Sequence, residues 1–261
     1  MTQTDDSTIY TSLEPKSPVA TTALEVARVY DVFSVLVELA KARFSGELGG
    51  KLLLYGALDA AGATVALAGN IAGAATLGVD CDGERLKQGI RQAYCDFLVN
   101  NLDEALRILK NEIRKRQPVS VCLEADFAVI LGEMVERGVQ PDLLAFALPS
   151  SETNVLVERG AVRLGAFDLR GPVGEFGQEV TWSAASSPAL WLAKADALAA
   201  DVLPPDDPRR RWLRLAPRYL ARSMTARRYL RMTSEEAERF SLLVAAAVAS
   251  EAFGTEITVT R

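Results

Sequence analysis

The chain has 261 residues, of which 49% are hydrophobic and 24% are charged, and its formal net charge is −5. This composition is typical of a globular protein with a sizeable core, and the negative charge argues against a general nucleic-acid binder, which needs a clustered positive surface. Histidine is absent, which excludes a serine–histidine–aspartate triad, a histidine-bearing zinc site and an imidazole acid or base within this chain.

The start of the chain predicts a polar arm. Residues 1–20 are polar, contain two prolines, and lack the basic region and apolar core of a signal peptide. No uncharged apolar run approaches the roughly 20 residues that a membrane span needs. The three cysteines are odd in number and suit reduced core thiols better than a disulfide framework or a metal site. We therefore expect a mobile arm on a cytoplasmic protein that binds no metal and no membrane.

Beyond the arm, helical and strand-like apolar patterns alternate. Residues 22–44 have helical spacing. Strands are predicted at 52–55, 77–81, 119–123 and 143–148, with helices between and after them at 60–76, 83–94, 102–116, 125–137 and 152–159. Short apolar strands that alternate with helices indicate parallel strands with right-handed crossovers. The sequence therefore predicts an α/β fold with a doubly wound, mostly parallel sheet.

After residue 160 the pattern becomes irregular and then helical. Glycines punctuate residues 165–177, helices are predicted from about Ser187, Asp206 and Ser234, and a last strand is predicted at 257–260. We expect residues 161–261 to complete the domain that begins at residue 21, or to form a cap on it.

Several short segments occur in the order of a known family. Residues 51–82 look like the first βαβ unit of a dinucleotide-binding domain. The other matching segments are YDVF at 30–33, AGAA at 72–75, VDCD at 79–82, NLDEAL at 101–106, RGVQPD at 137–142 and LPPDD at 203–207. Over roughly residues 29–250 the chain resembles urocanase (urocanate hydratase), specifically its central NAD-binding Rossmann-like domain. The resemblance implies a Rossmann-like fold, a tightly bound NAD that acts as an electrophile, and a homodimer.

The cofactor-binding residues that the resemblance assigns are partly altered. The family's first turn is a glycine-rich run, whereas here ALDAAGATVA follows Gly56 and contains only Gly62. Each lost glycine adds a Cβ where a phosphate oxygen should lie, and Asp59 adds a negative charge there. The family's ribose-binding acid corresponds to Asp80, with Arg85 shortly after it; the alternative is an acid that ends a strand and caps a helix.

Two later loops also depart from the family's pattern. Glu124-Ala125 stands where the family has Gly-Asn, and FALPSS at 146–151 replaces a polar segment. Three of the four cofactor-binding loops thus differ, which favours no cofactor over NAD bound in the family's manner, although both interpretations stay open. The chain also carries no match to the family's catalytic segment, so no residue here inherits a catalytic role from it.

Glu124 is a candidate acid or base on other grounds. It follows a predicted strand at the edge where open α/β sheets bind ligands, and desolvation by Phe127 and Phe146 would raise its pKa into a useful range. The alternative is simple capping of the next helix.

Residues 206–232 contain nine arginines interleaved with Trp212, Tyr219 and Tyr229. Arginines beside aromatic rings bind phosphate, carboxylate or planar anions, so Arg218, Arg222 and Arg227 are candidates for substrate binding and Tyr219 for a general acid. The alternative is a solvated pair of amphipathic helices whose arginines form salt bridges with nearby aspartates.

Two functional hypotheses follow from these observations. The first is a lyase, hydratase or isomerase that binds a small anionic organic ligand at the carboxyl edge of the sheet without the residues that urocanase uses. The second is a non-catalytic dimerisation or partner-binding module whose NAD site has decayed.

Overall fold

The computed structural model describes residues 18–146, 149–165, 177–220 and 224–261. The arm predicted for residues 1–20 therefore lies outside the described residues except at its end, where helix α1 (Pro18–Arg43) already begins. Among the described residues, none of the helices is both long enough and apolar enough to cross a membrane.

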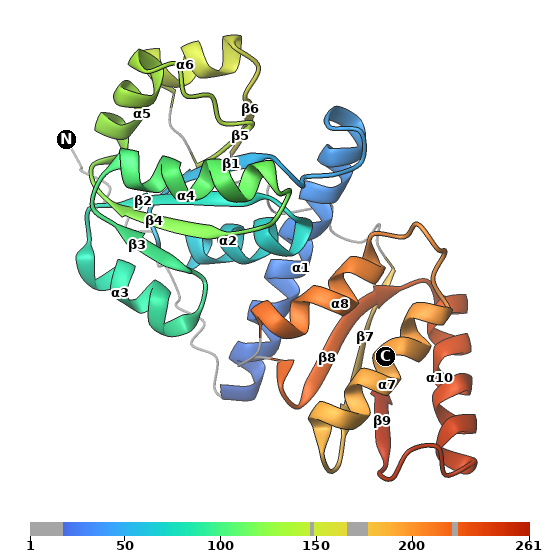
Figure 1. Ribbon diagram of the computed structural model, residues 1–261. Helices are drawn as coiled ribbons and strands as arrows, with labels where there is room; N and C mark the ends of the chain where they lie inside the picture. The colour runs from blue at the N-terminus through green and yellow to red at the C-terminus, as the bar shows by residue number, and fades with distance from the viewer. Residues whose placement is uncertain (1–17, 147–148, 166–176, 221–223) are drawn as a thin grey trace, which may run out of the picture.

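Six parallel strands form the main sheet, in the spatial order β3-β4-β2-β1-β5-β6 (Figure 1). Their bounds are β1 Leu52–Gly56, β2 Ala75–Asp80, β3 Phe97–Val99, β4 Ser120–Glu124, β5 Leu143–Ala145 and β6 Val162–Leu164. This arrangement confirms the predicted doubly wound α/β class. Strands β3 and β6 were not predicted, because the apolar run of β3 is only three residues long and that of β6 is interrupted by Arg163. Strand β5 is equally short but was predicted, because its apolar run continues to residue 148 in the sequence.

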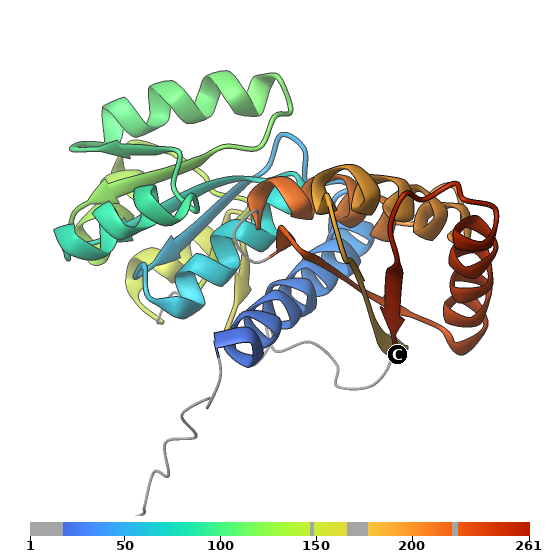
Figure 2. The ribbon, with the colours of Figure 1, turned by 90° about the horizontal axis from the view of Figure 1, so that it is seen from below.

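Helices cover both faces of this sheet, which is why the central strands are continuously apolar. Leu53 and Tyr55 of β1 pack in one core with α1, α2 (Ala60–Ala72) and α3 (Gly83–Gln92). Leu52 and Leu54 face a second core with α4 (Leu102–Arg114), α5 (Phe127–Glu136) and α6 (Ser151–Glu158). Figure 2 shows α2 and α4 on opposite sides of the strands.

The C-terminal part contains a second sheet, which is antiparallel and has the order β8-β7-β9. Its strands are β7 Gln178–Ala184, β8 Arg227–Met232 and β9 Ile257–Thr260, accompanied by helices α7 Pro188–Asp201, α8 Arg209–Tyr219 and α10 Ser234–Ala249. The three predicted helices and the last strand are present. Strands β7 and β8 were not predicted, and within the described residues the arginine-rich segment comprises helix α8 and strand β8, so the part from Arg227 to Met232 is a strand and not part of a helix pair.

Aromatic packing joins the two sheets through α1. The Tyr30 ring lies edge-on to Trp212, 4.8 Å between centroids, and to Tyr229, 5.4 Å between centroids. The Trp212 Nε1 donates to the Tyr229 carbonyl oxygen at 2.8 Å. Helix α8 is also tied to the end of α2, because Arg211 Nε donates to the Ile71 carbonyl oxygen at 2.9 Å. The core that begins on α1 therefore continues into the C-terminal sheet.

Candidate functional site

The strand order places a topological switch point between the carboxyl ends of β1 and β5. The chain runs from β1 to β2 on one side and later returns to β5 on the other, and ligands bind at such a switch point in open α/β sheets. Ala57, just after β1, has φ +64° and Phe146, just after β5, has φ +59°. Both backbones adopt the left-handed conformation that glycine favours, although neither residue is glycine.

Asp59 caps the N-terminus of α2 at this switch point. Its Oδ1 accepts hydrogen bonds from the backbone N–H groups of Ala61 at 2.9 Å and Gly62 at 3.0 Å. In a dinucleotide-binding fold the N–H groups at this helix end bind the diphosphate. The protein's own carboxylate therefore occupies the donors that a phosphate would use.

Asp80 ends β2 and is buried, with only 4% of its surface exposed. Its Oδ2 accepts from Leu58 N at 2.6 Å, its Oδ1 accepts from Asp82 N at 2.9 Å, and Arg85 Nη2 lies 3.2 Å from Oδ1. Arg85 also pairs with Asp82 at 3.0 Å. The structure thus brings the predicted ribose acid and arginine together, but it uses both carboxylate oxygens to hold the β1–α2 and β2–α3 turns.

The two retained glycines have packing reasons of their own. A Cβ on Gly62 would lie 2.0 Å from the Ala57 carbonyl oxygen, so the close approach of α2 to the turn requires glycine. A Cβ on Gly56 would lie 3.0 Å from the ring of Phe127, which covers the end of β1. Their presence therefore does not by itself indicate a phosphate site.

Two further helices at this edge begin in the same way as α2. Asp82 caps α3 by accepting from Glu84 N at 3.0 Å and Arg85 N at 3.2 Å. Asp126 caps α5 by accepting from two successive backbone N–H groups at 2.8 and 3.1 Å. The hydrogen bond from Arg85 N, with further donors, lowers the pKa of Asp82. Three helix N-termini at the carboxyl edge are thus neutralised internally by aspartates.

Glu124 is exposed at the end of β4, beside Asp80 in the strand register. The expectation that Phe127 and Phe146 desolvate its carboxylate is therefore wrong. Its Oε1 lies 3.0 Å from the position that a Cβ on Gly83 would take, at the start of α3. Water can reach this carboxylate, so the geometry gives it no special environment for proton transfer.

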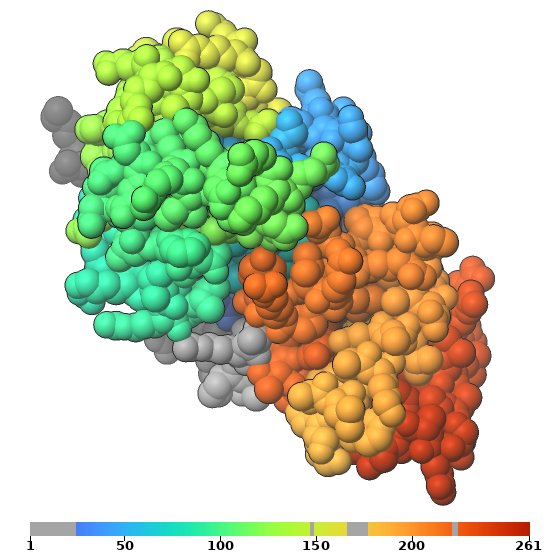
Figure 3. Space-filling model, viewed as in Figure 1, coloured from blue at the N-terminus to red at the C-terminus, as the bar shows by residue number. Residues whose placement is uncertain are grey.

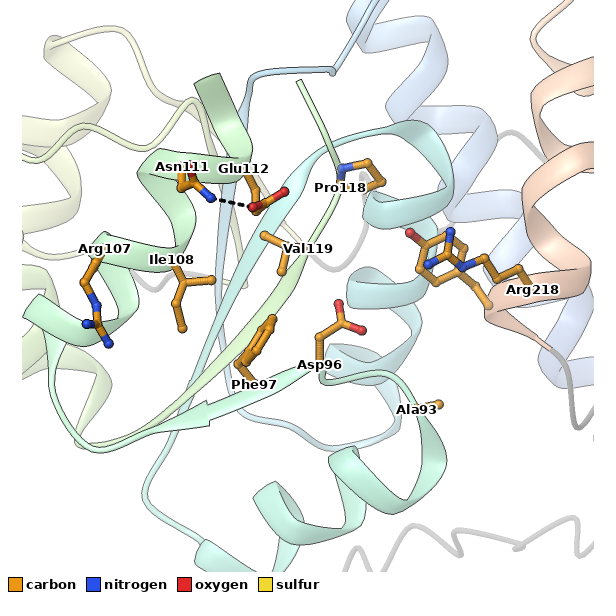
Figure 4. A pocket seen from close by; sticks show the side chains of 11 residues that line it. Ala93, Asp96, Phe97, Arg107, Ile108, Asn111, Glu112, Pro118, Val119 and Arg218 are labelled. Atoms are coloured by element: carbon orange, nitrogen blue, oxygen red, sulfur yellow. Dashed lines mark hydrogen bonds between the residues drawn. The ribbon is translucent and has the colours of Figure 1, made fainter. Parts of the chain in front are cut away.

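Arg218 and Tyr219 lie at the opposite edge of the sheet. They line a cavity of about 1020 Å³ together with Asp96, Phe97 and other residues from β3, α4 and the approach to β4 (Figure 4). Asp96 immediately precedes β3, so this cavity is at the amino edge. Tyr219 therefore cannot act together with Glu124, contrary to the single site expected from the sequence.

Tyr219 is partly buried in this cavity wall, and burial raises its pKa despite the nearby positive charge of Arg218. The Arg218 guanidinium lies over the Tyr219 ring, 5.7 Å from its centroid. Arg227 begins β8, is exposed and lies opposite Ser183 in the antiparallel sheet, away from the cavity. Arg222 lies outside the described residues.

Other arginines of the cluster form internal ion pairs. The sequence predicted salt bridges with nearby aspartates as one alternative but did not identify the pairs. Arg209 binds Asp207 at 2.6 Å and Glu236 at 2.7 Å, and all three side chains are largely buried. Arg228 binds Asp196 at 2.9 Å. These arginines hold α8, β8, α7 and α10 together, so much of the cluster is structural.

Metal-binding chemistry has no support in the described ranges, where no group of three or more histidine, cysteine, aspartate or glutamate side chains is placed to hold an ion. The cysteines are all free thiols. Cys81 is exposed after β2, whereas Cys95 and Cys122 are buried.

Residues 29–147 match the family model described as the urocanase Rossmann-like domain. The match begins within α1 and reaches just beyond β5, so it contains the turns after β1, β2 and β4 that Asp59, Asp82 and Asp126 close. The antiparallel sheet and its helices lie outside the match.

Proposed function

We propose that residues 29–147, a Rossmann-like domain of the urocanase type, no longer bind NAD and that the chain acts as a non-catalytic dimerisation or partner-binding module. The observation that supports this proposal is the Asp59 carboxylate, which accepts hydrogen bonds from the N–H groups of Ala61 and Gly62 in the first turn of α2. The same helix end would have to receive the diphosphate of NAD.

The electrostatic cost of adding a diphosphate there is substantial. Two unit charges 4 Å apart repel by about 1 kcal/mol in water and by about 4 kcal/mol at the effective dielectric constant near a protein surface. Because Asp59 is exposed, the smaller figure is the appropriate one, and the two N–H donors are lost as well. We therefore expect the diphosphate affinity of this helix end to be reduced at least about tenfold.

Calorimetric titration with NAD and with inorganic pyrophosphate tests the proposal. Wild-type protein should release no NAD on denaturation, as judged by mass spectrometry, and should give no binding heat with millimolar NAD. Asp59→Gly frees the N–H groups of Ala61 and Gly62 and should bind pyrophosphate at least about tenfold more tightly. Asp126→Gly is the matched control, because it frees two N–H groups of α5 in the same way; a gain there measures the general effect of an open helix end, and the gain in Asp59→Gly should exceed it.

Either cap variant should lose only a few tenths of a kcal/mol of stability, because glycine is itself an acceptable N-cap. NAD released from purified wild-type protein would overturn the proposal. An unchanged pyrophosphate affinity in Asp59→Gly would contradict the explanation through Asp59.

A second candidate function is an enzyme of the lyase, hydratase or isomerase type that binds a small anionic organic ligand. The supporting observation is the cavity at the amino edge, not at the carboxyl edge expected from the sequence, where the Arg218 guanidinium lies over the Tyr219 ring. Titration with small dicarboxylates should then show binding that Arg218→Ala weakens. The control Arg227→Ala, an exposed arginine on the other sheet, should leave it unchanged, and no binding by wild type would exclude this candidate.

A further inference from the structure

The basic residues of the chain are concentrated on two segments that flank the amino-edge cavity. Residues 107–116, at the end of α4 and in the loop after it, and residues 209–219 of α8 together hold ten of the 29 lysines and arginines but only one of the 34 acidic residues. In Figure 3 the orange residues of α8 lie beside the green residues of α4 and β3. A chain with a net charge of −5 therefore has a positive surface at this edge of its main sheet.

Several of these cations have no carboxylate partner. Arg107 and Arg114 are two turns apart on one face of α4, and Arg214 and Arg218 are one turn apart on one face of α8. All four are exposed, and none of them forms an ion pair with a residue in the described ranges. Their charges are therefore available to a negatively charged partner.

The cavity between the two helices has an apolar middle and cationic ends. Phe97 is 48% exposed and lines the middle of the cavity with Ile108 and Val119, whereas Arg107 and Arg218 lie at opposite ends (Figure 4). We call these five residues the amino-edge cleft. The cavity of about 1020 Å³ is at the upper limit of pockets for small molecules, which measure about 300–1,000 Å³. A ligand that contacts both arginines and the ring must therefore be extended.

The acidic side chains beside the cleft are already engaged. Glu112 Oε1 accepts from Lys115 Nζ at 2.8 Å, and Asp96 Oδ2 accepts from Ser120 N at 2.8 Å. Asp96 Oδ1 has no hydrogen-bond donor among the residues that the structure describes. It can accept a backbone N–H of a bound peptide, whereas a nucleic acid would place phosphates beside this carboxylate. The cleft wall therefore favours a polypeptide over a nucleic acid.

We propose that the amino-edge cleft binds an extended acidic segment of a partner protein. An apolar or aromatic side chain of that segment lies on the Phe97 ring, and carboxylates before and after it bind Arg107 and Arg218 in the bidentate geometry that guanidinium groups favour. The apolar contact at the centre supplies most of the affinity, and the outer ion pairs supply specificity and guide the approach. This inference rests on the proposed function, because it names the chemistry of the partner that the module binds.

Fluorescence anisotropy with two labelled peptides of equal charge tests the contact at the centre. The peptide DEEFEED should bind the wild type with a Kd below about 100 µM at about 50 mM salt. The peptide DEESEED lacks the aromatic side chain and should bind at least about tenfold more weakly. Phe97→Ser should weaken the binding of DEEFEED at least about tenfold and that of DEESEED less than about twofold, because only the first peptide uses the ring.

Charge reversal tests the two ends of the cleft. Arg107→Glu and Arg218→Glu should each weaken the binding of DEEFEED at least about fivefold, with an unchanged far-UV circular dichroism spectrum. Arg227→Glu is the matched control, because Arg227 is an exposed arginine on the antiparallel sheet, away from the cavity. It changes the net charge equally but should change the Kd less than about twofold, which separates contact in the cleft from general attraction.

Four results would overturn the inference. They are no binding of either peptide, equal affinity of the wild type for both, a loss in Arg227→Glu as large as that in Arg218→Glu, and tighter binding of an oligouridylate of equal charge than of DEEFEED. Displacement of labelled DEEFEED by millimolar succinate would overturn it as well, in favour of a small anionic ligand.

Failure of the inference is distinguishable from failure of the proposed function. NAD released from a protein that binds DEEFEED as described would refute the loss of NAD binding alone. A protein that releases no NAD and binds neither peptide would refute the role of the cleft alone.

Discussion

Asp80→Ala decides whether this acid is a structural group or a ligand for a ribose. In the structure the carboxylate accepts from Leu58 N at 2.6 Å and from Asp82 N at 2.9 Å, and it is paired with Arg85. Alanine leaves both N–H groups without their acceptor. Leu58 is 2% exposed, so its N–H loses its partner in a buried environment.

The loss of stability can be estimated from these contacts. A buried donor without an acceptor costs about 1–3 kcal/mol, and the second N–H is closer to solvent and adds about 1 kcal/mol. Arg85 keeps its pairing with Asp82 at 3.0 Å, so its charge does not become isolated. The expected destabilisation is about 2–4 kcal/mol, a large part of the 5–15 kcal/mol by which domains are usually stable.

Urea unfolding followed by far-UV circular dichroism measures this difference. Asp82→Ala is the matched control, because it removes an exposed N-cap two residues away and should cost only about 1 kcal/mol. Asp80→Asn keeps an acceptor for one of the two N–H groups and should fall between the two. If Asp80→Ala is no less stable than Asp82→Ala, the hydrogen bonds at Asp80 do not hold the two turns and the structural explanation is wrong.

Three further predictions follow from the same structure. Ala57→Gly should raise the free energy of unfolding by about 0.5–1 kcal/mol in urea titrations, because it relieves a left-handed alanine; a loss would contradict this. Gly62→Ala should lower it by about 3 kcal/mol, because the new Cβ would lie 2.0 Å from a backbone oxygen, and a neutral result would show that the turn can relax. Burial alone would raise the pKa of Asp207 and Glu236, but hydrogen bonds from Arg209 outweigh it and lower both. The stability that these two carboxylates give is therefore complete above about pH 5 and is lost as the pH falls through the lowered values. Arg209→Met should abolish that acid-side loss in stability measured from pH 2 to 6, while costing about 3 kcal/mol at pH 7; an unchanged slope would refute the assignment.

The two edges of the main sheet differ in the polar groups that they leave available to a ligand or partner. At the carboxyl edge, aspartates cap α2, α3 and α5, so the usual place for an anionic ligand is already satisfied. At the amino edge, arginines and the exposed ring of Phe97 remain available. This contrast favours recognition through the amino edge over cofactor chemistry at the carboxyl edge.

The sequence predicted the elements whose patterns are long. The apolar runs of β1, β2, β4 and β5 and the helices between them were recognisable, because buried parallel strands are continuously apolar and helices keep a 3.6-residue period. Strands β3 and β6 lack that signal, because the apolar run of β3 ends after three residues and β6 is interrupted by Arg163. Strand β8 was hidden by its arginines, since Arg228 is buried against Asp196 through a contact between segments far apart in the chain.

The amino-acid sequence by itself determined the fold class, the likeness to the urocanase domain and the loss of glycines in the first turn. Only the tertiary structure decided what the remaining polar groups do. An aspartate at position 59 or 80 could bind either a ligand or the backbone, and the sequence is the same in both cases. Which of the two it binds depends on where the neighbouring backbone N–H groups lie. Glu124 and Tyr219 lie at opposite edges of the sheet. The direction of the parallel strands places Glu124 at the carboxyl edge, and the packing of α8 on α2 places Tyr219 at the amino edge.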